Sequence, residues 1–66
     1  MAVTQAQIKE TLEGYIDAMQ TKKDEGTLTD GKREELEYVK NFMGRVVKSK
    51  SVQKTLQDRI TTLLSS

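Results

Sequence analysis

The apolar residues of this sequence recur at intervals of three and four positions, and no proline interrupts the pattern in any of the 66 residues. This spacing places apolar side chains along one face of an α-helix, whereas a half-buried strand needs them at every second position. Because proline is absent, only glycine and the capping residues can divide the chain into separate helices. The sequence therefore predicts an all-α fold without strands.

The first predicted helix covers residues 5–24. Thr4 and Gln7 stand three positions apart, the spacing of a capping box in which each side chain bonds the backbone of the other. Gly26 follows the helix at the position where a glycine commonly ends one. The apolar stripe of this helix consists of Ile8, Leu12, Tyr15, Ile16 and Met19.

The second predicted helix covers residues 30–48, with Thr29 or Asp30 as its cap. Its apolar face spans about half of the circumference because two aromatic residues widen the stripe on one flank. A face this wide favours contact with two neighbours, so we expect this helix to be the central one. The face consists of Leu36, Val39, Met43, Val46 and Val47, with Tyr38 and Phe42 on its flank.

The phase of the apolar pattern changes after Lys48. Continuing the preceding stripe would place apolar residues near positions 50, 53 and 57, which hold Lys50, Gln53 and Gln57. A break at residues 49–51, capped by a serine, restores one common apolar face and predicts a third helix over residues 51–64. One kinked helix through this region is the alternative. The third stripe consists of Val52, Leu56, Ile60, Leu63 and Leu64.

Three amphipathic helices with short connections predict one domain over residues 1–66, a small antiparallel three-helix bundle. Only 35% of the residues are hydrophobic, and a core of about 17 side chains barely offsets the chain entropy of so short a protein. Association with another chain is therefore expected. An open helical hairpin that oligomerises is the alternative architecture.

The composition excludes several kinds of chemistry. Without Cys or His the chain has no thiolate ligand, no disulfide and no imidazole base, so we expect no enzyme, no cofactor and no metal site. Glu10, Glu13 and Asp17 share one face of the first helix, but that face is expected to be solvated. No apolar run is long enough for a membrane span and no leader precedes the first helix, so the expected location is the cytoplasm.

Charge is distributed unevenly along the chain. Residues 1–37 carry 5 basic and 9 acidic side chains, whereas residues 38–66 carry 6 basic side chains and one acid, Asp58. Such asymmetry is typical of a surface for an acidic protein or for phosphates, although the two halves could also attract each other within the bundle. Aromatic residues and arginine are favoured at interfaces. The residues predicted to bind a partner are Tyr38, Phe42, Arg45, Lys48, Lys50 and Lys54.

These features favour a non-enzymatic protein–protein interaction module, such as an adaptor, an inhibitor or an assembly subunit. A nucleic-acid-associated protein that uses the basic stretch of residues 40–59 is one alternative, and a purely structural homo-oligomer is another. The near-neutral net charge of +1 and the lack of aromatic residues among the basic ones favour a protein partner over nucleic acid.

Overall fold

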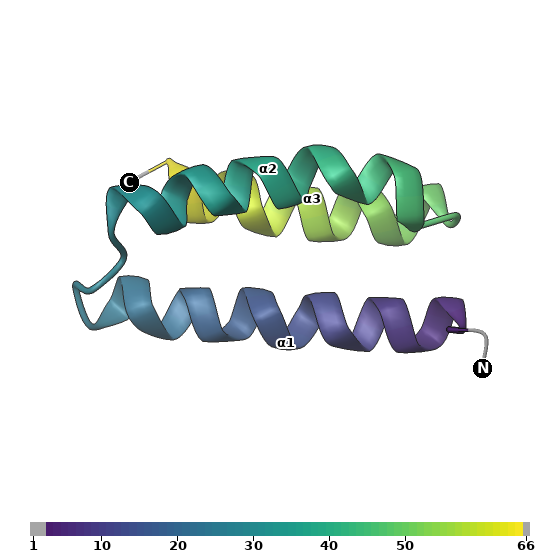
Figure 1. Ribbon diagram of the computed structural model, residues 1–66, viewed down its shortest axis with the longest axis horizontal. Coiled ribbons are helices and arrows are strands. Elements are labelled where there is room, and N and C mark those ends of the chain that lie inside the picture. Colours follow the sequence, from purple (N-terminus) through teal and green to yellow (C-terminus); the bar gives the residue numbers. More distant parts are fainter. Residues whose placement is uncertain (1–2, 66) are drawn as a thin grey trace.

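The protein is an antiparallel bundle of three helices, as the sequence predicts (Figure 1). The computed structural model describes residues 3–65, which contain α1 (Gln5–Asp24), α2 (Asp30–Val46) and α3 (Lys50–Leu64) and no strand. Each helix reverses the direction of the one before it, and the molecule measures 36 × 20 × 17 Å. No helix in this part of the chain is both long and apolar enough to cross a lipid bilayer.

Local capping residues set the helix ends. The Thr4 hydroxyl accepts a hydrogen bond from the Gln7 backbone N–H, and the Gln7 side chain accepts one from the Thr4 backbone, which completes the predicted capping box. Gly26 adopts a φ of 74° just after α1, a left-handed conformation that side chains with a Cβ disfavour. The Ser49 hydroxyl caps α3 by accepting from the Val52 N–H, so the predicted break between the last two helices is confirmed.

The end of α2 differs from the prediction by two residues. The helix ends at Val46, and Val47 has an extended backbone with φ −92° and ψ 113°. Val47 is nevertheless only 6% exposed. At the end of α2 the chain therefore leaves the helix and still places this side chain in the core.

The core lies along the common axis of the three helices. Eight of the described side chains are buried, two from α1, two from α2, three from α3 and one from the connection that precedes α3. Half-buried residues from the predicted stripes surround them, including Leu12, Val39 and Val52. The buried set consists of Ile16, Met19, Leu36, Met43, Val47, Leu56, Ile60 and Leu63.

The central helix is α3, so the expectation that α2 is central was wrong. α3 packs closely against both other helices, whereas α1 and α2 approach each other less closely. The Gln57 side chain donates to the Lys40 carbonyl on α2 at 2.9 Å, and Arg59 pairs with Asp17 on α1. The sequence argument failed because part of the wide face of α2 is exposed: Tyr38 and Phe42 are not covered by a neighbouring helix.

Candidate interaction surface

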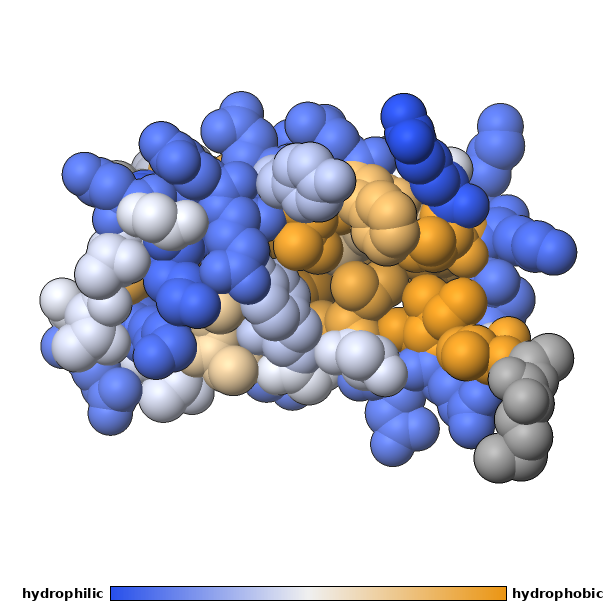
Figure 2. Space-filling view, in the orientation of Figure 1, coloured by the Kyte–Doolittle hydropathy of each residue, from blue (hydrophilic) through white to orange (hydrophobic). Residues whose placement is uncertain are grey.

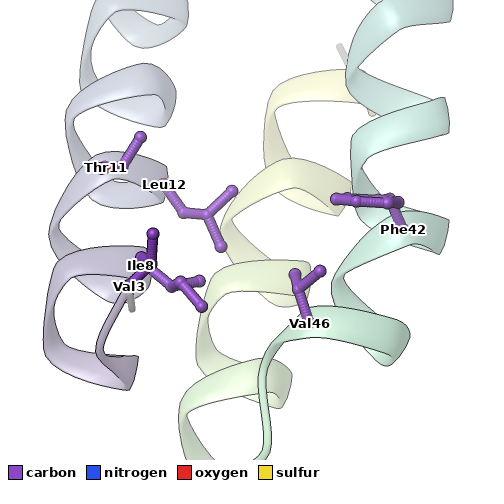
Figure 3. A pocket seen from close by; sticks show the side chains of 6 residues that line it. All are labelled: Val3, Ile8, Thr11, Leu12, Phe42 and Val46. Atoms are coloured by element: carbon purple, nitrogen blue, oxygen red, sulfur yellow. The ribbon is translucent and has the colours of Figure 1, made fainter. Parts of the chain in front are cut away.

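An apolar groove lies between α1 and α2, on the side of the bundle away from α3 (Figure 3). The groove has a volume of about 330 Å³ and is open to solvent. In the space-filling view, a continuous apolar area occupies the end of this face where α1 begins and α2 ends (Figure 2). Because α3 holds the two helices from behind, their front edges are left uncovered. The groove is lined by Val3, Ile8, Thr11, Leu12, Phe42 and Val46.

Capping of α1 positions one wall of the groove. Val3 stands just before the N-cap, and its side chain lies beside that of Ile8 in the groove wall, which is the contact of a hydrophobic staple (Figure 3). Gln5 then ties the start of α1 to the end of α2: its side-chain amide donates to the Val46 carbonyl at 3.1 Å and accepts from the Lys48 N–H at 2.9 Å. The two walls are therefore fixed relative to each other at this end.

Part of the predicted partner site adjoins the groove. Tyr38, Phe42 and Arg45 line a shallow hollow of about 220 Å³ on the outer face of α2, together with Asn41. Tyr38 is 73% exposed and Phe42 is 45% exposed, so neither aromatic ring belongs to the core. Phe42 also lines the groove, which makes the two surfaces continuous. We refer to these four residues as the aromatic strip.

The structure separates the three predicted lysines from the aromatic strip. Lys48 lies in the connection between α2 and α3, and Lys50 and Lys54 lie one turn apart on α3. One flank of α3 faces α2 through Gln57, and the opposite flank faces α1 through Arg59. Lys54 occupies the remaining outer side of the helix, Lys50 lies seven residues before Gln57 on the flank towards α2, and both side chains are exposed. None of these three lysines lines the hollow beside Tyr38, Phe42 and Arg45.

Ion pairs within the bundle are few and exposed. The predicted attraction between the acidic and basic halves is represented by one interhelical pair, and exposed pairs of this kind contribute about 0–1 kcal/mol. None of the four basic residues predicted to bind a partner forms an ion pair within residues 3–65. The pairs in this part of the chain are Lys9–Glu13 at 3.9 Å, Lys32–Glu35 at 3.1 Å and Asp17–Arg59.

Two neighbouring titratable groups within residues 3–65, Tyr15 and Glu35, have clearly shifted pKa values. Burial, and next the negative charge of Glu35 on α2, raise the pKa of the Tyr15 hydroxyl to about 12. A hydrogen bond from Lys32, at 3.1 Å, lowers the pKa of the Glu35 carboxyl. A pKa of 12 makes Tyr15 a poor base or nucleophile near neutral pH. The described residues also hold no group of three acidic side chains arranged to bind a metal ion.

Sequence reasoning missed the α1 wall of the groove, because it assigned Ile8 and Leu12 to the apolar stripe that faces the core and gave Val3 no role in binding. A signal was present in the sequence. The acidic residues of α1 fall on one side of its stripe, and the positions on the other side are uncharged as far as Ala18, with Lys22 following one turn later. An uncharged flank beside an apolar stripe widens the apolar surface that a helix can offer. These flanking positions, all exposed, are Gln7, Thr11, Gly14 and Ala18.

Searches against protein-family models, curated proteins and solved structures found no match to this chain.

Proposed function

We propose that this protein is a non-enzymatic interaction module that binds another protein chain through the groove and the adjoining aromatic strip. The observation that carries this proposal is the open apolar groove between α1 and α2, beside which Val3 is 67% and Phe42 is 45% exposed. Contiguous apolar patches on small proteins mark interaction sites more often than isolated apolar residues do. An adaptor, an inhibitor and an assembly subunit would each use such a surface.

The composition of the surface supports a protein partner. Each Å² of apolar area removed from water contributes about 25 cal/mol, so filling the groove provides a driving force for association. Covering the uncharged flank of α1 would require little desolvation of charge. Tyr38 and Arg45 are of residue types enriched at binding hot spots, and Arg45 would attract an acidic group beside the apolar contact.

The test compares two variants of the tagged full-length chain, Phe42→Asp and Lys54→Glu. Phe42→Asp places a charge at the edge of the groove, whereas Lys54→Glu reverses a charge on the outer side of α3. We expect proteins captured from an extract of the source organism to bind the wild-type chain and Lys54→Glu but not Phe42→Asp. Titration of a captured protein, once purified, should show at least a tenfold weaker affinity for Phe42→Asp.

Two results would contradict the proposal. Capture that is unchanged by Phe42→Asp would show that the groove is not the binding surface, provided that far-UV circular dichroism confirms the fold of the variant. Loss of binding with Lys54→Glu alone would assign the interaction to α3 instead. Labelled single-stranded and duplex nucleic acids, titrated at low and physiological salt, test the nucleic-acid alternative, for which affinity must fall steeply with salt.

A further inference from the structure

The exposed face of α2 carries an acid at one end, aromatic residues in the middle and a base at the other end. Glu34, Tyr38, Phe42 and Arg45 follow one another at spacings of four, four and three residues, which places them on one side of the helix. Glu34 and Arg45 are exposed, and Tyr38 and Phe42 are the exposed aromatic side chains described above. Neither Glu34 nor Arg45 forms an ion pair within the described part of the chain.

This order of residues is complementary to itself when the helix is reversed. The midpoint between Glu34 and Arg45 falls between positions 39 and 40, and the midpoint between Tyr38 and Phe42 falls at position 40. These midpoints differ by half a residue, which is about 0.75 Å along a helix that rises 1.5 Å per residue. One two-fold axis near position 40 therefore brings each Glu34 opposite an Arg45 and each Tyr38 opposite a Phe42.

We propose that two copies of this chain associate through the exposed face of α2, antiparallel about a two-fold axis that crosses this face at the level of position 40. In this dimer the four aromatic rings pack at the centre, and one Glu34–Arg45 pair closes each end. In the antiparallel arrangement the positive N-terminal end of each α2 lies beside the negative C-terminal end of the other, which is electrostatically favourable. Because Phe42 lines both the aromatic strip and the groove, the second copy covers one edge of the groove. This inference rests on the proposed function and identifies the partner.

An unrelated partner chain explains the order of residues less well. A hetero-partner that fills the groove needs apolar side chains, but it does not require opposite charges placed symmetrically about the aromatic residues of α2. A two-fold contact requires that symmetry, because in an isologous interface a contact between residue i of one copy and residue j of the other is always repeated between residue j of the first and residue i of the second. The charge pattern therefore favours a second copy as the occupant.

The contact area sets the expected strength of the dimer. α2 has 17 residues and is about 25 Å long, so one helix face against another buries less than a standard interface of roughly 1,200–2,000 Å². We therefore expect a dissociation constant on the order of 1–100 µM. The dimer should be sought by sedimentation equilibrium of the full chain over roughly 0.5–500 µM, a range that brackets these values.

Charge reversal tests the geometry. Glu34→Arg places two pairs of like charges across the axis, and Arg45→Glu does the same with opposite sign, so each variant should dimerise about tenfold more weakly. An equimolar mixture of the two variants restores both pairs in a heterodimer, and the double variant restores both in a homodimer. Glu10→Arg on α1 and Lys54→Glu on α3 are the matched controls, and both should dimerise like the wild-type chain.

The outcomes separate this inference from the proposed function. A wild-type chain that stays monomeric over the whole concentration range overturns the dimer, and Phe42-dependent capture of another protein would then leave the proposed function standing. Single reversals that dimerise like the wild type, or a mixture that stays as weak as its components, overturn the antiparallel geometry. Circular dichroism of each variant shows whether the fold is kept. A variant that fails to fold is replaced by Glu34→Gln or Arg45→Gln, each of which should weaken the dimer by a smaller factor. A glutamine variant that dimerises like the wild type would refute the Glu34–Arg45 pairing.

Discussion

Replacing Leu56 with Ala tests whether the buried face of α3 holds the bundle together. Leu56 is 2% exposed on the helix that packs against both others. The substitution removes three carbon atoms from the core, a transfer free energy of roughly 2.4 kcal/mol at about 0.8 kcal/mol for each carbon group. The cavity left behind adds to this, so we expect a loss of about 2–5 kcal/mol. A chain of 66 residues has a free energy of unfolding of only about 3–10 kcal/mol, so the substitution should remove a large part of it.

The structure also predicts a gradation between positions of the same residue type. Leu12 is half-buried and borders the open groove, so part of its side chain already contacts water. Leu12→Ala should therefore lower the free energy of unfolding by only roughly 1–2 kcal/mol. Lys54→Ala, on the exposed outer side of α3, is the control and should change the stability by less than about 0.5 kcal/mol.

Urea denaturation followed by far-UV circular dichroism measures these differences. The measurements should be made at a few micromolar protein, because self-association would add concentration-dependent stability. A midpoint for Leu56→Ala that matches the midpoint for Lys54→Ala would refute the assignment of the core. An equal loss for Leu12→Ala and Leu56→Ala would refute the inference that the α1–α2 side of the bundle is open.

Tyr15→Phe should keep or raise the stability at neutral pH, because the buried Tyr15 hydroxyl has no hydrogen-bond partner of standard geometry. The pKa of this hydroxyl is about 12 in the folded chain, against an ordinary value of 10.0, so the unfolded chain releases this proton first and the wild type loses stability as the pH rises from 10 through 12. Thermal melts between pH 9 and 12 should therefore show a steeper decline for the wild type than for Tyr15→Phe, and parallel declines would contradict this explanation. Gly26→Ala should destabilise by about 1 kcal/mol because Gly26 has a φ of 74°. Gly14→Ala should stabilise by a similar amount, because the added Cβ would meet no atom within 4 Å apart from its chain neighbours and the backbone of its own helix. Thermal melts that show the same sign for both glycine variants would count against the backbone argument.

The helix boundaries could be predicted from the sequence because they depend on contacts between near neighbours. The capping box of Thr4 and Gln7, the left-handed Gly26 and the Ser49 cap each act within about four residues. The two-residue difference at the end of α2 has another cause. Val47 has an extended backbone and is buried in the core between the helices, a contact that no local pattern in the sequence indicates.

The arrangement of the helices could not be read from the width of the apolar stripes. A stripe shows how much apolar surface a helix carries, but it does not show whether another part of the same chain covers it. α2 has the widest stripe, and Tyr38 and Phe42 on its flank are exposed instead of covered. For this reason the sequence placed α2 at the centre of the bundle, where the structure places α3.

The candidate site was partly predictable for the same reason. Tyr38, Phe42 and Arg45 share one helix, so their spacing alone places them on one side. Their relation to Lys50 and Lys54 depends on how α3 turns back after Ser49, which no local pattern determines. The α1 wall of the groove likewise depends on the distance between α1 and α2, which α3 sets from behind.

The central position of α3 links the small core to the proposed interaction. If the three helices packed equally, all three helix–helix interfaces would be buried. Here α3 packs closely against α1 and against α2, and the interface between α1 and α2 stays open on the side away from α3. Ile8, Leu12 and Val46 line this open side and also pack against the buried core, so polar residues at these positions would weaken the bundle itself. Association with another chain removes this apolar surface from water without changing the core. The same residues of α1 and α2 therefore stabilise the fold and, in the proposed dimer, adjoin its interface.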